Sequence, residues 1–530
     1  MMVKTNKMHK SKIMRNAKWE EKHMAKKIVS LLLCVAMTAT LLTGCGDNST
    51  ANTDADKDVS TNTEVESEAD SEGEDAVDPL RADEGTTISI AHNQGEYIYE
   101  TFYAMGEKFT EMTGIEIEWI EVPNADWGTW TTAQFAAGTE PDIVWSVAKD
   151  YYDQGKLMNL TEYYDQENPF NGKIWRDCFS TENALTNCYS NDGQDLICTA
   201  MTYSSVNLYY NKDIMEELGL GTEPPTNYSE LIAMMDVAKE DGTYVPMSAM
   251  NSTRWNLSWI EDDYMDALFD GTDVVEKLDI IVPNGYMDYS EIMLGLKTGV
   301  ISYDDPRFEE YFRLIKELTQ YFNEDFNSAS WEYEGLFNDS KALFTFNGGW
   351  FPGQVVQNGY EVNYGTTKKP YVDEAYSEYG VSEGFLGAAP SGEAVFFVSK
   401  KAEDEGRGDA AVKFLQFMTC PEGGAQMYID VVMLGTCIAD VVLPDEIAGL
   451  ATSEYGDHKT TRLIRSFMYD ENGEVTSKYW EMFTEYVDPA STKTAAEFIE
   501  DLKAELLPAL DDTIEEYTTY DILSYVDQVQ

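Results

Sequence analysis

The side chains that could carry covalent or metal chemistry are few in this chain of 530 residues. Cys178, Cys188 and Cys198 are spaced ten residues apart, which is neither a Cys-x-x-Cys pair nor a ligand spacing for structural zinc. Beyond residue 45 the only histidines are His92 and His458, too few for a histidine-rich metal site or a His-dependent triad. We therefore expect no catalytic residue, no metal and no cofactor.

The cysteines also bear on disulfide bonding. Cys420 and Cys437 raise the number beyond residue 45 to five, which is odd. One disulfide among them would suit an extracellular location, but a chain of this length can build a core without cross-links. The sequence therefore favours buried free thiols and leaves one disulfide as the alternative.

An export signal precedes Cys45. Two lysines are followed by an apolar run from Ile28 to Leu42, which is too short to span a bilayer. Small residues follow, and the run ends on Cys45. This resembles the lipobox of bacterial lipoproteins, in which the cysteine thiol is acylated and becomes the mature N-terminus. We expect residues 1–44 to be a lipoprotein signal peptide, with Met24 a better start than Met1; an ordinary secretory signal with an incidental cysteine is the alternative.

The acidic composition limits the range of partners. Residues 46–85 carry fourteen acidic side chains against Lys57 and Arg81, so we expect residues 45–85 to be a disordered tether. The whole chain has a net charge of −59, which repels phosphate backbones and excludes nucleic acid as a partner. The remaining folded part is long enough to favour two lobes over one core.

Beyond the tether, the spacing of apolar residues predicts alternating strands and helices. Strands are expected at 86–91, 115–122 and 143–145, and helices at 99–113 and 127–137. A strand, helix, strand order of this kind implies a parallel sheet.

Six short motifs then occur in a fixed order along the chain. They are Gly138 to Ile143, the hairpin turn Asp192-Gly193, Tyr209 to Asp213, Pro224 to Leu231, Lys341 to Trp350, and Ala411 to Glu422. In this order they resemble the extracellular solute-binding proteins of carbohydrate ABC transporters. The resemblance covers Thr86 to about Ile438, whereas residues 441–530 show helical patterning without a recognisable motif.

The resemblance implies an α/β fold of two lobes joined by hinge strands, with a ligand cleft between the lobes. The expected boundaries are 86–201 for the first part of lobe one and 202–365 for the first part of lobe two. The second parts are expected at 366–420 for lobe one and at 421–530 for lobe two, the latter with a helical C-terminal region.

The function implied is capture without catalysis. The protein would be a monomer on the outer face of the cytoplasmic membrane, attached only through its lipid. It would bind a carbohydrate, expected to be an oligosaccharide, and deliver it to the permease subunits of an ABC importer. A glycan-active hydrolase, a surface adhesin, and a binding protein for peptides or polyamines are the alternatives.

A neutral sugar needs aromatic platforms and polar side chains, and 12% of this chain is aromatic. Trp350 follows a Gly-Gly pair at the end of an expected strand and is the first candidate, with a core tryptophan as the alternative. Trp255 and Trp259 are four residues apart and would share one face of a helix. Trp255 lies beside Arg254 at the polar start of its segment, so we expect these two to contact the ligand and Trp259 to pack.

In lobe one, Asn93 and Gln94 follow the first strand, and Trp145 and Ser146 lie at the carboxyl end of the third. Ligands of open α/β sheets bind at the carboxyl ends of parallel strands, so these four residues are candidates.

Further candidates come from the resemblance. Tyr203 and Ser204 occupy the hinge region in which the family often has a polar ligand contact, although Ser204 stands where an acid would be expected. Glu393 could reach the cleft, with a solvated carboxylate as the alternative. Asn211 is expected to cap a helix instead.

Overall fold

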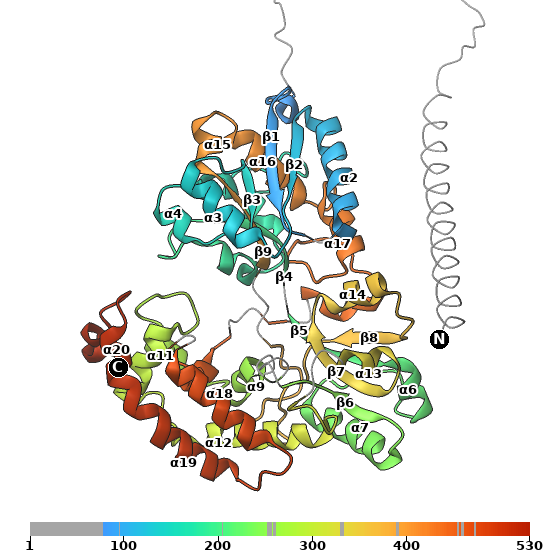
Figure 1. Cartoon of the computed structure of the whole chain (residues 1–530), viewed down its shortest axis with the longest axis vertical. Coiled ribbons are helices and arrows are strands. Elements are labelled where there is room, and N and C mark those ends of the chain that lie inside the picture. The colour runs from blue at the N-terminus through green and yellow to red at the C-terminus, as the bar shows by residue number, and fades with distance from the viewer. Residues whose placement is uncertain are drawn as a thin grey trace, which may run out of the picture. The chain divides into compact units, whose positions relative to one another are not determined.

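The protein is described by a computed structural model of two lobes, each a sheet covered by helices (Figure 1). The structure describes residues 78–529, except residues 95, 204, 252–256, 258–260, 329–332, 388–391, 453–454, 457–459 and 471–472. Within these residues the two sheets have five and four strands.

The first lobe begins with the predicted strand, helix, strand order. β1 (Thr87–His92) is followed by α2 (Glu96–Thr113), β2 (Glu116–Glu121), α3 (Trp127–Ala137) and β3 (Ile143–Trp145). β1 pairs in parallel with both β2 and β3, which confirms the parallel pairing expected for these three strands.

Two later strands complete the first sheet. β9 (Gly392–Val398) lies antiparallel between β3 and β4 (Cys198–Tyr203), and the strand order is β2-β1-β3-β9-β4. β4 therefore runs in the same direction as β1 and β3, and all three strands end at one edge. The other helices of this lobe are α4 (Asp150–Asp153), α5 (Thr161–Tyr164), α15 (Lys400–Asp404), α16 (Gly408–Met418) and α17 (Ala425–Val432).

A buried ion pair fixes the loop that leads into β3. Asp142 Oδ1 accepts hydrogen bonds from Nε and Nη2 of Arg407 at 3.0 and 2.7 Å. Asp142 Oδ2 accepts two more, from the backbone N–H and the hydroxyl of Ser89 on β1 at 2.8 and 3.0 Å. The motif from Gly138 to Ile143 is therefore a structural joint between β1, β3 and the start of α16.

The second lobe has a smaller mixed sheet. β5 (Val206–Asn211) pairs antiparallel with β7 (Ala342–Gly348) and β8 (Tyr364–Thr367), and β6 (Val245–Ser248) pairs parallel with β7. Its helices are α6 (Lys212–Glu217), α7 (Tyr228–Asp241), α9 (Glu261–Leu268), α10 (Val274–Leu278), α11 (Tyr289–Thr298), α12 (Pro306–Leu318), α13 (Tyr333–Asn338), α14 (Phe351–Asn358), α18 (Glu474–Val487), α19 (Ala495–Leu506) and α20 (Leu510–Glu516).

Asn211 ends β5 and starts α6. Its side-chain oxygen accepts hydrogen bonds from the backbone N–H groups of Asp213 and Ile214 at 3.1 and 3.0 Å. This satisfies amides that have no partner within the helix, and it confirms the predicted cap.

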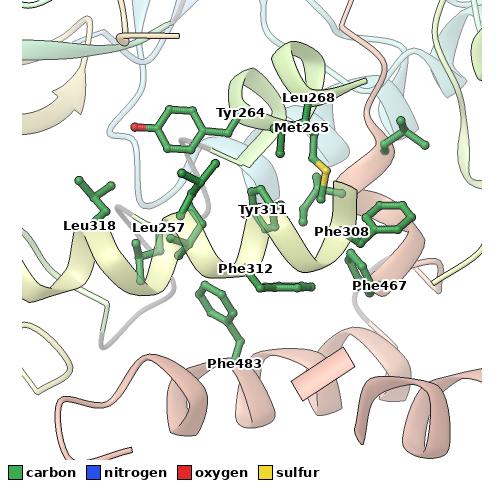
Figure 2. Close-up of a cluster of buried hydrophobic side chains, with 14 of the residues drawn as sticks. Leu257, Tyr264, Met265, Leu268, Phe308, Tyr311, Phe312, Leu318, Phe467 and Phe483 are labelled. Atoms are coloured by element: carbon green, nitrogen blue, oxygen red, sulfur yellow. The ribbon is translucent and has the colours of Figure 1, made fainter. Parts of the chain in front are cut away.

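The C-terminal region completes the core of the second lobe. Phe312 on α12 is fully buried, with its ring 5.1 Å from that of Phe467 and 4.9 Å from that of Phe498 on α19. Figure 2 shows Phe312 facing Phe467 and Phe483, which come from later parts of the chain. The region without a recognisable motif is therefore an integral part of this lobe.

The chain changes lobes at positions that differ from those predicted. Tyr371 and Val381 pack in the second core, although the first lobe was expected to resume at residue 366. Tyr428 and Ile438 pack in the first core, beyond the expected return to lobe two at residue 421. Apolar residues suit either core equally well, so their sequence pattern does not reveal which core receives them.

The folded part also begins earlier than predicted. A short 3₁₀ helix, η1 (Pro79–Arg81), lies within the segment 45–85 that was expected to be a disordered tether. Asp83 pairs with Lys413 on α16 at 2.7 Å, and the Lys413 side chain is largely buried. An acidic composition predicts a solvated tether, and this long-range partner overrides it.

The five cysteines beyond residue 45 are free and buried, as the sequence favours. Burial raises the pKa of the Cys420 thiol to about 12, with the neighbouring Glu422 carboxylate adding to the effect. The Cys420 thiol is therefore a poor nucleophile at neutral pH.

Two features are absent from the described residues. No helix there combines the length and apolar character needed to cross a bilayer. No group of three or more His, Cys, Asp or Glu side chains there is arranged to hold a metal ion.

Replacing Phe312 with alanine should lower the free energy of unfolding by about 3–5 kcal/mol, because it removes a ring enclosed by other rings. Urea denaturation followed by circular dichroism would measure the loss. Val356→Ala is the control, since Val356 is 64% exposed and should change stability by no more than about 0.5 kcal/mol. A loss for Phe312→Ala no larger than the control would mean that the C-terminal helices do not share this core.

Candidate functional site

The topology brings the ends of several strands together at the junction of the lobes. β1, β3 and β4 end at one edge of the first sheet, and only residues 204–205 separate β4 from β5. The start of β5 pairs with the end of β7, through Val206 and Gly348. β6 runs parallel to β7 and ends at the same side. Residues that follow β1 and β3 therefore share the junction with residues that follow β7 (Figure 1).

Two amides extend from the end of β1. Asn93 donates a hydrogen bond from Nδ2 to Oδ1 of Asn124 at 2.8 Å, and Gln94 Oε1 accepts one from the hydroxyl of Tyr428 at 3.4 Å. Both side chains are half-buried. These contacts orient the amides at the sheet edge, where they can exchange hydrogen bonds with a ligand.

The end of β3 has an unusual backbone. Ser146 has a φ of 37°, a left-handed conformation that side chains other than glycine rarely adopt. Its carbonyl accepts a hydrogen bond from the indole N–H of Trp127 at 3.3 Å. Trp145 is 7% exposed, and its ring meets that of Phe396 edge to face at 4.6 Å. The turn exposes the Ser146 side chain while leaving Trp145 mostly covered; backbone strain of this kind is concentrated at functional sites.

Trp350 is half-buried just beyond β7, at the start of α14. Its indole lies so close to Gly348 that a Cβ atom at that position would overlap the ring. The backbone N–H of Gly349 donates to the carbonyl of Ser205 at 2.8 Å, which ties this turn to the link between the lobes. The Gly-Gly pair has no side chains, and it thus allows the indole to lie close to the strand.

The remaining sequence candidates separate into three groups. Tyr203 is 1% exposed, and its hydroxyl donates to the backbone carbonyl of Leu450, so it presents no free polar group to a ligand. Glu393 is exposed on β9, in register with Thr202. Ser204, Arg254, Trp255 and the proposed lipid-bearing Cys45 lie outside the described residues.

His92 is the last residue of β1, so its buried side chain fixes the start of the Asn93-Gln94 loop. Its side chain is fully buried among the rings of Tyr99, Phe102 and Trp119, and neither ring nitrogen has a hydrogen-bond partner. Burial lowers the pKa of His92 to about 4, because the charged imidazolium would lose its hydration there. The histidine is therefore neutral at physiological pH and acts as an aromatic core residue.

Residues 94–425 match the family model described as "Bacterial extracellular solute-binding protein". The chain belongs to this family. A probable sugar-binding periplasmic protein of Brucella melitensis is 25% identical over 298 residues, which are 54% of this chain. The match covers 61% of that relative's own length.

Solved structures of solute-binding proteins share the fold. The apo form of RafE from Streptococcus pneumoniae aligns with a TM-score of 0.57 and 19% identity, over 80% of this chain and 97% of that one. The cyclic alpha-maltosyl-1,6-maltose binding protein of Arthrobacter globiformis aligns with a TM-score of 0.54 and 16% identity, over 81% and 99%. These likenesses confirm the two-lobe α/β fold expected for this solute-binding protein.

The structure adds residues that the sequence analysis missed. The ring of Trp127 stacks on that of Trp130 at 5.7 Å, beside Ser146, and their spacing of three on a helix was the available signal. In the second lobe, Asn347 on β7 donates to Glu334 at 2.9 Å. Burial raises the pKa of that carboxyl. Glu334 comes from a separate helix, so no local pattern links it to Asn347.

Lowering the pH should decrease the free energy of unfolding through His92. Its pKa is depressed in the fold, so its contribution to stability is complete above the unfolded value of 6.5 and is lost as the pH falls toward 4. At pH 5 the loss should be about 2 kcal/mol. His92→Phe should remove this part of the pH dependence, measured as the difference in unfolding free energy between pH 7 and pH 5 by urea denaturation. Equal pH dependence in both proteins would contradict the assignment.

Proposed function

We propose that this protein is a lipid-anchored receptor that captures a neutral carbohydrate between its lobes and passes it to an ABC importer. The observation that carries the proposal is the convergence of strand ends at the junction. Amides and hydroxyls from β1 and β3 lie on one side, and an indole after β7 lies on the other. Such groups bind by hydrogen bonding and stacking, which suits a polyhydroxylated ligand.

The proposed contacts are divided between the lobes. In this proposal the first lobe contributes its strand-end groups and the second contributes Trp350 at the start of α14. The residues proposed to bind the ligand are Asn93, Gln94, Trp145, Ser146, Ser204, Arg254, Trp255, Trp350 and Glu393. Closure of the lobes around the ligand would then complete the site from both sides.

A neutral oligosaccharide is the ligand class that fits best. The net charge of −59 disfavours anionic solutes at long range. One relative is named as a sugar-binding protein, and one structural neighbour is named for a maltose-derived cyclic sugar. Both names agree with the aromatic and amide groups at the junction.

The proposed location follows from the export signal, and the proposed permease partner follows from the family. Acylated Cys45 would hold the protein at the outer face of the cytoplasmic membrane, and residues 46–77 would act as the tether. The protein would bind as a monomer without catalysis and dock on permease subunits once its lobes have closed.

A thermal-shift screen of residues 46–530 tests the ligand class. A ligand that binds only the native state raises the melting temperature by mass action. One class of mono- or oligosaccharide should do so and be recovered intact. Release of reducing sugar would indicate a hydrolase. A shift only with peptides or polyamines would mean that the ligand belongs to that class and is not a carbohydrate. No shift with any solute would favour an adhesin.

Trp350→Ala should weaken binding of that sugar about tenfold or more, because stacking on the indole is lost. Isothermal titration calorimetry measures the affinity, and the melting temperature should change little because the indole is only half-buried.

Trp480→Ala is the matched control. Trp480 lies on α18 and is 6% exposed, so its loss should cost about 3–5 kcal/mol of stability and leave the sugar affinity unchanged. If Trp350→Ala instead behaved like this control, the indole would be a core residue and not a ligand platform.

A further inference from the structure

Along the part of the chain that the structure describes, successive elements change lobes three times. The first crossing runs from Tyr203 to Val206, and the second precedes β9. The third leads from Ile438, in the first core, to a 3₁₀ helix η5 (Asp445–Leu450). Hinge motion is absorbed at such crossings, so contacts that join one crossing to another control how freely the lobes move.

Tyr203 packs against the segment that comes just before the third crossing. Its backbone N–H donates to the carbonyl of Gly435 at 3.2 Å, and a Cβ atom at Gly435 would overlap the Tyr203 ring. The neighbouring Thr436 donates from its hydroxyl to the carbonyl of Met201 on β4 at 2.7 Å. The segment around Gly435 is thus part of the first lobe.

The hydroxyl of Tyr203 reaches the other end of the same crossing, where it donates to the carbonyl of Leu450. η5 packs on β8 of the second lobe. The approach is so close that a Cβ atom at Gly449 would overlap the carbonyl of Thr366. Leu450 therefore belongs with the second lobe, and the buried hydrogen bond from the Tyr203 hydroxyl to its carbonyl joins the two lobes.

A second tyrosine reinforces this contact. The ring of Tyr455 meets that of Tyr203 edge to face at 6.2 Å. The hydroxyl of Tyr455 donates to Oδ1 of Asn207, on β5, at 3.4 Å. The segment that follows η5 thus holds both sides of the first crossing, Tyr203 at its start and Asn207 just after its end.

We infer that Tyr203 is a positioning residue that restrains the hinge, with its hydroxyl bonded across the lobes to Leu450. This inference rests on the proposed function, since the restraint matters only if the lobes close on a ligand. When one lobe rotates against the other, the Tyr203–Leu450 hydrogen bond is either kept or broken. Breaking it would leave a buried carbonyl without a partner, which is costly. The bond therefore narrows the range of angles that the ligand-free lobes adopt.

Tyr203→Phe tests the restraint, because it removes the hydroxyl and keeps the ring. Labels at Ala133→Cys on α3 and Val237→Cys on α7, both exposed, would report the distance between the lobes by single-molecule fluorescence energy transfer. Tyr469→Phe is the matched control. Tyr469 is also 1% exposed, and its hydroxyl donates to the carbonyl of Leu506 at 2.5 Å within the second lobe.

Tyr203→Phe should broaden the distance distribution of the ligand-free protein, whereas Tyr469→Phe should leave it unchanged even if both lower the melting temperature equally. A distribution for Tyr203→Phe that coincides with the control overturns the inference. This readout needs no ligand, so it is independent of whether a sugar binds.

Sugar affinity gives the second readout. A looser ligand-free protein must give up more freedom on closing, so Tyr203→Phe should weaken binding about two- to tenfold. An unchanged affinity with a broadened distribution would overturn the link between the restraint and binding. Failure of wild type to bind any carbohydrate would overturn the proposed function and leave the distance measurement valid.

Discussion

The pairing of β9 between β3 and β4 is the constraint on which the arrangement of this protein depends. β4 enters the first sheet only through β9, and β9 arrives after the chain has built most of the second lobe. The first sheet is therefore completed by a strand that follows most of the second lobe in the sequence. Repeated crossing between the lobes follows from this, and so does the meeting of strand ends at the junction.

The candidate ligand residues owe their positions to buried groups that contact no ligand. Asp142 holds β1, the entry to β3 and Arg407 together, with two of its hydrogen bonds to a guanidinium that stays charged at any physiological pH. His92 supports the Asn93-Gln94 loop from within a cluster of rings. The buried ring cluster thus lies directly before the polar Asn93-Gln94 loop, and the buried ion pair fixes the opposite, N-terminal end of β3.

Local patterns predicted the local structure well. The apolar spacing located β1, α2, β2, α3 and β3, and the cap at Asn211 was found because capping depends on a residue and its next few neighbours. The lobe boundaries failed for the opposite reason. Whether Tyr371 or Tyr428 joins one core or the other depends on distant partners, and their own neighbourhoods are equally apolar.

The candidate site shows the same division. Asn93, Gln94 and Ser146 could be chosen from the sequence because a strand end is a local feature with a known role in open sheets. The contact of Asn347 with Glu334 could not be chosen in this way, since its two partners come from separate elements.

Tyr203 shows most clearly what could not be predicted from the sequence. From sequence, a tyrosine at a strand end beside a hinge suits a ligand contact and an internal contact equally. The structure places its hydroxyl on the carbonyl of Leu450, some 250 residues away along the chain, where the donor is already used. A polar group at the junction can contact the ligand or make an internal contact at the hinge. The burial of its side chain distinguishes these two roles. For Tyr203, with 1% of its surface exposed, that criterion favours the hinge.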